Sequence, residues 1–369
     1  MSGFARIYKA PTMENYNDGN LLYSVKDVIS YDYTKHFSYP GEFTISFPLT
    51  KELLAVCVAD NVIIYDGDTL IIEDVNYDTA EEILIVKGTD GKGLLSRRIT
   101  APYDDDWGET YGYDVFEGST ADCIVAIIDH NLISTPDTER SYDLSISRNG
   151  VTGITDKFMT KLDYLSDIVR NLCDNAGTGY EIYYDCEGIS PSWLLKMKLI
   201  AGVDRSMQQS AISRVIFSPG SRNASGLSFE NCSSNLKNAI YATGAGVTSC
   251  VYRDSSVPSG FSRKECAVDV STDTVADVPE LAIEAVKDNI ATSSFNVTPI
   301  SGYGTEYFIG DFVSVRDTYG NRFYSGQITT VEKSYSGDSK NLSITLGTGK
   351  PKFLNRIINN IINGTQQRR

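Results

Sequence analysis

The chain has 369 residues, seven cysteines and a formal net charge of −15. This length allows about two to four domains, and a content of 23 tyrosines and 41% hydrophobic residues favours β-sheets with packed cores. The cysteines are odd in number and form no C-x-x-C pair, so we expect free thiols in a reducing compartment rather than a disulfide framework. The N-terminus lacks an apolar signal-peptide core and no apolar stretch approaches about 18 residues, which argues against a cleaved signal and a membrane span.

The charge is distributed unevenly along the chain. Residues 60–122 contain sixteen acids and four bases, a net charge of −12, whereas residues 350–369 contain five bases and no acid. Binding along nucleic acid depends on clustered basic residues, so this acidic chain is not expected to bind nucleic acid along its surface. We interpret the acidic excess as a solvated face that aids solubility.

The first third of the chain predicts antiparallel strands. Residues 43–47 alternate between apolar and polar side chains, and Asp66-Gly67 separates two β-branched runs, which is the strongest short-range signal for a hairpin. A third strand is expected to end at Gly88, where a positive φ would let the chain leave the sheet.

After Gly93 the pattern becomes mixed. A capping box from Ser119 to Asp122 predicts a helix start. A second helix is predicted within residues 156–177, followed by a strand from residue 180. Its apolar residues at helical spacing are Phe158, Leu162, Leu165, Val169 and Leu172.

From residue 213 the strand pattern returns, interrupted by a helix with Pro279 as its first residue. Residues 311–347 read as a meander of three strands and resemble residues 60–88, so the pattern predicts two copies of one β unit. The alternative is that any two meanders look alike. Gly347 is expected to end the second copy as Gly88 ends the first.

No catalytic, cofactor-binding or metal site is predicted. Gly349-Lys350 follows a strand pattern, but a phosphate loop requires a glycine at the position of Ile344 and a hydroxyl residue at that of Pro351. The two histidines, His36 and His130, are expected beside aromatic residues and at a helix end. They are too few for a zinc site of the usual kind.

The C-terminal residues predict a short amphipathic helix with a basic frame that includes Arg356. It either folds back on its own domain or docks another component near a threefold axis. Its apolar stripe consists of Phe353, Leu354, Ile357, Ile358, Ile361 and Ile362.

Taken in order, six segments make the sequence similar to the tail-hub, or baseplate-hub, proteins of long-tailed bacteriophages, in the short form found in phages and prophages of Gram-positive bacteria. The segments are "GKGLLSRRIT" from Gly91, "LIAGVDRS" from Leu199, "VIFSPG" from Val215, "NLKNAIYATGAG" from Asn235, "GFSRKECAVDVS" from Gly260 and "EYFIGDFVSVRDTYGNRFYSGQITTVEKS" from Glu306.

This resemblance implies a multidomain, β-rich α+β fold with two tube-like antiparallel β-barrels, an inserted α/β domain and a short C-terminal helix. The expected division is 1–98 for the first barrel, 99–205 for the α/β domain, 206–245 with 297–349 for the second barrel, 246–296 for a small insertion with one helix, and 350–369 for the basic amphipathic helix.

The resemblance also implies a structural, non-enzymatic role in a virion or phage-tail-like particle (tailocin) assembled in the bacterial cytoplasm. Three chains would form a ring that joins a hexameric tail tube to a trimeric spike or central fibre. Expected partners are the tail tube or distal tail protein, the tape-measure protein and other baseplate subunits, without sequence-specific nucleic-acid binding or stable membrane insertion. The acidic excess would then line the lumen of a conduit. Because the chain ends after one short helix, cell-wall cleavage is expected to reside in another subunit.

Two other functions compete with this interpretation. The acidic loop with Asp104, Asp105, Asp106 and Glu109 offers paired carboxylates beside Trp107, as in a cell-wall polysaccharide hydrolase or binding module. A soluble β-rich adhesin is the third candidate.

Overall fold

The computed structural model describes residues 4–10, 21–101, 114–135, 138–142, 144–153, 155–160, 162–185, 194–253, 257–270, 274–286, 289–317, 319, 322–337 and 339–347. They fall into two compact units. The first comprises the chain up to Leu227 together with Asn296–Leu346, and the second comprises Ser228–Phe295 and Gly347. The predicted C-terminal stripe, Arg356 and the acidic loop from Asp104 to Glu109 lie outside the described residues.

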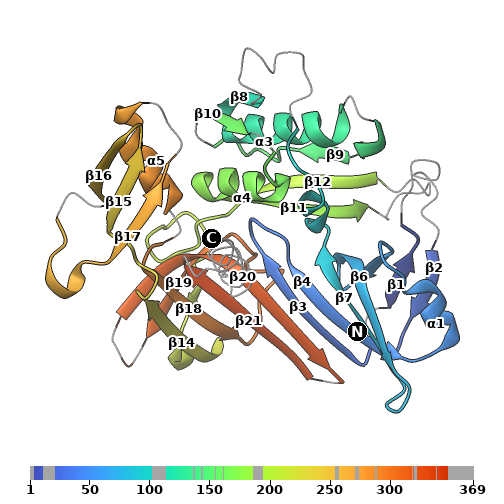
Figure 1. The fold of residues 1–369 in the computed structure, drawn as a ribbon. Helices are drawn as coiled ribbons and strands as arrows, with labels where there is room; N and C mark the ends of the chain where they lie inside the picture. The colour runs from blue at the N-terminus through green and yellow to red at the C-terminus, as the bar shows by residue number, and fades with distance from the viewer. Residues whose placement is uncertain are drawn as a thin grey trace. The chain divides into compact units, whose positions relative to one another are not determined.

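A 13-stranded sheet is the main feature of the first unit (Figure 1). Its main path has the order β14-β18-β21-β20-β3-β4-β7-β6-β5-β1-β2, and β13 and β19 branch from β20. The pairings with a defined register are antiparallel, except for parallel β13–β19. The predicted β-rich fold is confirmed at this level, whereas the two tube-like barrels and the five segments stay predictions.

The bounds of these strands are β1 (Ala5–Tyr8), β2 (Leu21–Val25), β3 (Ser30–His36), β4 (Glu42–Pro48), β5 (Val62–Tyr65), β6 (Asp68–Asp78), β7 (Ile83–Asp90), β13 (Ile216–Phe217), β14 (Ala224–Cys232), β18 (Thr292–Pro299), β19 (Phe312–Asp317), β20 (Arg322–Ser336) and β21 (Ser339–Gly347). The short helices α1 (Lys51–Val56) and α2 (Gly93–Ser96) lie between them in the chain.

The predicted hairpin at Asp66-Gly67 is confirmed, with positive φ at both turn residues and β5 antiparallel to β6. The expected strand end at Gly88 is wrong, because β7 continues to Asp90. A Cβ at Gly88 would lie 1.9 Å from the Ile71 carbonyl oxygen, beside an irregularity in the β6–β7 pairing. Glycine is therefore needed there for close backbone approach. Gly347 does adopt a positive φ, as predicted.

The two meanders meet through strands from distant parts of the chain. Residues Thr330 to Ser336 of β20 pair antiparallel with β3, from His36 back to Ser30. The sheet face beside this junction buries Tyr31 and Val331 completely. Full burial of an apolar side chain contributes roughly 1.5–3 kcal/mol, so the join between early and late strands is part of the hydrophobic core.

A mixed layer follows β7 in the chain, with helices α3 (Thr120–Ile128) and α4 (Leu165–Ala176) and the three-stranded sheet β11-β12-β9 (Figure 1). Its strands are β8 (Asp114–Ser119), β9 (Leu144–Ser147), β10 (Thr155–Thr160), β11 (Thr178–Asp185) and β12 (Leu194–Ala201). The predicted capping box is confirmed, since the Asp122 backbone N–H donates to Ser119 Oγ. The side chains of Cys123 and Cys173 are buried in this layer.

The predicted start of the second helix is wrong. Phe158 lies in β10 opposite Phe116 of β8, and Leu162 has a positive φ of 56°, so neither residue is helical. The helix begins at Leu165 and ends at Ala176, and the capping residue Gly177 adopts the left-handed conformation. Pairing with β8 therefore overrides the helical spacing at Phe158.

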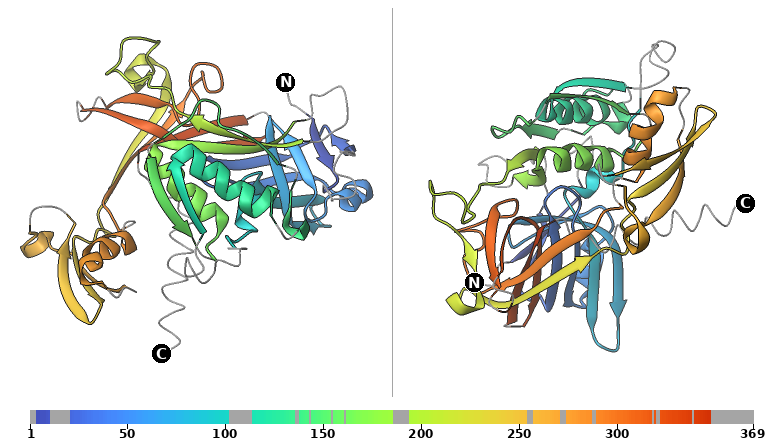
Figure 2. Two further views of the ribbon diagram at one scale, coloured as in Figure 1. Left: turned by 90° about the horizontal axis from the view of Figure 1, so that it is seen from above. Right: turned by 90° about the vertical axis from the view of Figure 1, so that its left-hand side faces the viewer.

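The second unit contains the sheet β16-β15-β17 and helix α5 (Val278–Ala285). The strands are β15 (Ala239–Gly244), β16 (Val247–Tyr252) and β17 (Glu265–Asp269). α5 lies against this sheet (Figure 2). Its Val278 and Ala282 are buried in one hydrophobic cluster with Ile240 and Ala242 of β15. Pro279 is the second residue of this helix, one position later than expected. No helix in the described parts of the chain is long and apolar enough to cross a bilayer.

Candidate functional site

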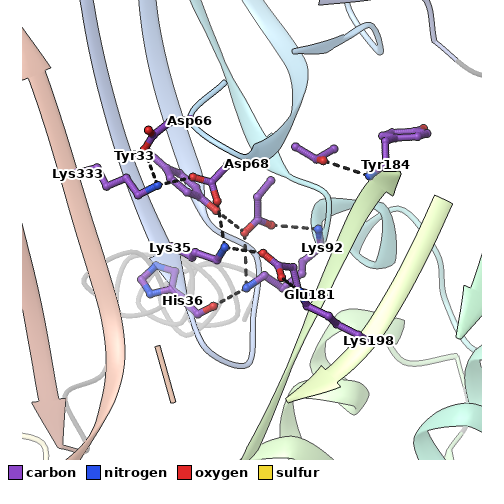
Figure 3. A network of polar contacts seen from close by, with 12 residues as sticks. Tyr33, Lys35, His36, Asp66, Asp68, Lys92, Glu181, Tyr184, Lys198 and Lys333 are labelled. Atoms are coloured by element: carbon purple, nitrogen blue, oxygen red, sulfur yellow. Dashed lines mark hydrogen bonds and ion pairs between the residues drawn. The ribbon is translucent and has the colours of Figure 1, made fainter. Parts of the chain in front are cut away.

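A buried network of lysines and carboxylates connects three parts of the first unit (Figure 3). Lys35 comes from β3, Asp66 and Asp68 from the β5–β6 turn, Glu181 from β11 and Lys333 from β20. The tight Asp66-Gly67 turn carries Asp68 back to the first position of β6, where it is 6% exposed. Local turn geometry thus places a carboxylate in the interior.

Asp68 is the centre of this network. One carboxylate oxygen lies 3.0 Å from Lys35 Nζ and the other lies 2.6 Å from Lys333 Nζ. Lys333 also lies 2.8 Å from Asp66, and the Tyr335 hydroxyl donates to the same Asp66 oxygen at 2.9 Å. Burial alone would lower the pKa of Lys333, but Asp68 and Asp66 raise it above its ordinary value. Burial alone would also lower the pKa of Lys35, but Asp68 and Glu181 raise it, so both lysines remain protonated at neutral pH.

The network reaches the mixed layer through Glu181. Lys35 Nζ lies 2.6 Å from one of its oxygens, and Lys198 Nζ of β12 lies 2.8 Å from the other. Burial alone would raise the pKa of Glu181, but Lys35 and Lys198 together lower it to about 2. Nearby, the Tyr184 backbone N–H donates to Thr69 Oγ1 of β6 at 3.2 Å. Charged and neutral contacts therefore join β11 to the main sheet.

A second buried ion pair, between Lys92 and Asp90, lies beside this network (Figure 3). Lys92 is 1% exposed, and its ammonium donates to the His36 carbonyl oxygen and lies 3.5 Å from Asp90. The Tyr33 hydroxyl donates to Asp90 at 3.0 Å. Burial raises the pKa of Asp90 and lowers that of Lys92, although each partner opposes the other's shift. His36 stacks on Tyr39 at 3.9 Å between ring centroids, and burial lowers the pKa of its imidazole to about 3.

This arrangement is suited to mechanical connection. Asp68 bridges lysines from β3 and β20, and Lys35 bridges Asp68 to Glu181, so three chain segments share one set of ion pairs. Removing one partner from such a buried set costs about 3–5 kcal/mol, because it leaves an uncompensated charge. The described residues include no group of three or more His, Cys, Asp or Glu side chains that could hold a metal ion.

The network was not among the predicted sites, although the sequence carries a signal for it. Tyr31, Tyr33 and Lys35 alternate along β3, so they share one face, and the two tyrosines are buried. Val331 and Lys333 share a face of β20 in the same way, and Val331 is buried. A lysine at an inward position of an alternating strand indicates a buried carboxylate partner. The acids Asp68 and Asp90 accordingly do not belong to a solvated face.

Three solved structures share the fold over nearly the whole chain. The prophage tail protein gp18 from Listeria monocytogenes EGD-e is 12% identical with a TM-score of 0.52, and the alignment covers 96% of this chain and 98% of that one. The tail protein from Neisseria meningitidis MC58 is 14% identical with a TM-score of 0.53, and the alignment covers 94% of this chain and 97% of that one. The prophage MuSo2 43 kDa tail protein from Shewanella oneidensis is 10% identical with a TM-score of 0.50, and the alignment covers 93% of this chain and 97% of that one. A comparison with curated protein sequences gives no match.

The family comparison covers most of the chain. The model of the Siphovirus ReqiPepy6 Gp37-like proteins matches residues 14–348, which include both meanders, the mixed layer and the second unit. This protein therefore belongs to the Siphovirus ReqiPepy6 Gp37-like protein family, and its fold is that of phage tail proteins.

Proposed function

We propose that this protein is a structural tail hub of a phage or phage-tail-like particle. The observation that carries the proposal is the junction of β3 with β20, in which early and late strands share one antiparallel sheet and one buried ion network. Such a junction holds the two meanders in a fixed register. Membership of a siphovirus protein family and the tail-protein fold supply the biological context.

The assembly that this role requires is a trimer. Each chain contains two similar antiparallel meanders, β5–β7 and β19–β21. If each belongs to a tube-like barrel, three chains present six such units, which matches a hexameric tail tube on one side and a trimeric spike or central fibre on the other. The proposed partners are the tail tube or distal tail protein, the tape-measure protein and other baseplate subunits, and the proposed site is the tail tip. The proposed host of the particle is a Gram-positive bacterium.

The C-terminal residues are proposed to dock the next component. Burial of the six apolar side chains predicted between Phe353 and Ile362 would contribute on the order of 8 kcal/mol per helix before ordering costs. Basic residues such as Arg356 would face an acidic surface. Folding back on the same chain is the competing arrangement, and the experiment below separates the two.

Reconstruction of purified particles by electron microscopy tests both parts of the proposal. We expect three copies of this chain around the tail axis, and two, four or six copies would contradict the trimer. Particles whose hub is truncated after Gly349 should lose the spike or fibre. If they retain it at normal stoichiometry while the isolated subunit melts several degrees lower, the helix folds back and the docking role is wrong.

A further inference from the structure

The β6–β7 hairpin extends past the neighbouring strands of the first unit as an acidic projection (Figure 2). Residues 73–82, called here the acidic hairpin, contain five acids and no base, and all five acidic side chains are exposed: Glu73, Asp74, Asp78, Glu81 and Glu82. Tyr77 lies among them with 58% of its surface exposed. The hairpin therefore combines a high negative charge with one large exposed ring.

Most of this charge has no cationic partner among the described residues of the first unit. Glu73 lies 3.4 Å from Arg97, and Asp78 accepts hydrogen bonds from the backbone N–H groups of Ala80 and Glu81. Among the described residues, no lysine or arginine lies within ion-pair distance of Asp74, Asp78, Glu81 or Glu82. Five like charges on a short hairpin repel one another, and a basic partner would relieve that repulsion.

The second unit has a surface of opposite charge. Four basic residues, called here the basic end, gather where β15 and β17 begin and β16 finishes: Lys237, Arg253, Arg263 and Lys264. The backbone holds them together. Arg253 Nε donates to the Lys237 carbonyl oxygen at 3.1 Å, and the backbone N–H of Asn238, next to Lys237, donates to the Lys264 carbonyl oxygen at 3.0 Å.

Three of these cations are satisfied by carbonyl dipoles and not by carboxylates. Lys237 donates to the Glu265 carbonyl oxygen, Arg253 to that of Val286, and Lys264 to that of Ser233. The carboxylate of Glu265 lies 2.5 Å from Arg263 instead. In the described part of the second unit, Lys237, Arg253 and Lys264 have no acidic side chain within ion-pair distance. Among the described residues, the basic end thus keeps a net positive charge on an acidic protein.

Aromatic side chains lie beside the basic end. The Arg263 guanidinium stacks over the rings of Tyr241 and Tyr252, at 6.0 and 5.6 Å from their centroids. Phe261, two residues before Arg263 in the chain, is fully exposed. Tyrosine and arginine are the residues that most often dominate the binding energy of protein interfaces. The basic end therefore has the composition of a protein-docking surface.

We propose that the basic end of one copy of this chain docks on the acidic hairpin of a second copy. Each copy supplies one acidic hairpin and one basic end, so every homo-oligomer contains the two surfaces in equal number. Both surfaces also carry an exposed aromatic residue, which can exclude water from the contact. Because the two surfaces differ, the contact is heterologous, and such contacts close into a ring when the rotation between subunits permits it. The proposal rests on the proposed trimeric hub, for which it supplies the subunit contact.

Carbodiimide cross-linking tests this contact, because the reagent joins a carboxylate directly to a lysine. Particles are assembled from equal amounts of ¹⁴N- and ¹⁵N-labelled chain, treated, digested and analysed by mass spectrometry. We expect Glu81 or Glu82 joined to Lys237 or Lys264 in peptides of mixed isotope. Absence of these links, or links within one isotope only, would overturn the docking between copies. Three copies in the reconstruction without such links would leave the trimeric hub intact, whereas a different copy number would contradict the hub itself.

Charge reversal provides a second test. Glu81→Lys with Glu82→Lys should reduce the yield of assembled particles about tenfold or more, because like charges then face each other across the interface. Lys237→Glu with Lys264→Glu should have the same effect, and combining all four changes in one chain should restore assembly. The matched control is Asp27→Lys with Glu52→Lys, exposed acids of the first unit outside the hairpin, which should assemble normally. Equal yields from the control and the hairpin variant, or no recovery in a combined variant with native circular dichroism, would contradict the proposal.

Discussion

Asp68 shows how single residues hold the first unit together. Its two oxygens accept from lysines of β3 and β20, whose sequence positions are almost three hundred residues apart, at 3.0 and 2.6 Å. The carboxylate and Lys333 are both less than 10% exposed, so solvent screens their attraction weakly. Removing one partner from these contacts is therefore expected to cost far more stability than removing one partner from a surface pair of the same chain.

Replacing Lys333 with Met should lower the free energy of unfolding by about 3–5 kcal/mol, because Asp66 and Asp68 lose a buried cation. Lys87→Met on β7 is the control: this lysine is exposed, so the change should stay within about 0.5 kcal/mol. Urea unfolding of both variants, followed by far-ultraviolet circular dichroism, measures the difference. Equal urea midpoints for the Lys333→Met and Lys87→Met variants would show that Lys333 adds no more stability than an exposed lysine.

The lowered pKa of Glu181 gives a pH dependence with a defined sign. Its pKa falls from an ordinary value of 4.5 to about 2 on folding, so its ion pairs stabilise the protein fully above about pH 4.5. That contribution, roughly 3 kcal/mol, is lost as the pH falls from about 4.5 to 2. Glu181→Gln should therefore be less stable than wild type at pH 7, and the gap should close towards pH 2. A stability difference between wild type and Glu181→Gln that does not change with pH would contradict the lowered pKa of Glu181. So would a difference equal to that caused by Glu52→Gln.

At the scale of elements, glycines decide where strands turn and approach. Gly67 and Gly310 both have positive φ, of 80° and 93°. A Cβ at Gly67 would meet no atom within 4 Å, whereas one at Gly310 would lie 2.3 Å from the Phe37 ring. The first glycine serves the turn alone, while the second also allows the chain before β19 to pack on Phe37.

The two alanine variants should therefore differ in stability. Gly67→Ala should cost about 1–2 kcal/mol from backbone strain alone. Gly310→Ala should cost a further 1–3 kcal/mol or so, because the added methyl group overpacks the Phe37 site. Thermal melting of both variants measures the difference, and a Gly310 variant as stable as the Gly67 variant would show that the ring moves aside freely.

At the scale of the whole molecule, the proposed role is mechanical and not catalytic. One sheet connects strands from both ends of the chain, and the network that fixes it contains groups that stay charged at neutral pH. Groups of this kind do not exchange protons near neutrality, as a general acid or base must. The protein is thus expected to act by shape and contact within a particle.

Changing Asp104, Asp105 and Asp106 together to Asn tests the hydrolase alternative. We expect the wild-type protein to show no peptidoglycan hydrolysis in a turbidity assay, and the triple variant to assemble into particles as the wild type does. Hydrolysis by the pure wild-type protein that disappears in the variant would establish the hydrolase and overturn the structural role.

Local signals in the sequence determined many of the elements. Asp66-Gly67 specified its hairpin and Ser119 its helix cap, since these depend on the backbone preferences of a few adjacent residues. The alternating meanders were predicted because inward and outward side chains repeat every two residues. Phe158 was assigned wrongly, because its spacing suits a helix but its pairing partner in β8 lies some forty residues away. The order of motifs was sufficient to identify the family, which the family model confirmed.

The tertiary structure alone decided which distant residues meet. Lys35 and Lys333 each lie in an alternating strand, but the pairing of β3 with β20 brings both to Asp68. Likewise, only the fold gathers Lys237, Arg253 and Lys264 at one end of a small sheet. The physical reason is that electrostatic contacts depend on distance in space, which strand order sets, whereas sequence patterns report only on neighbours along the chain.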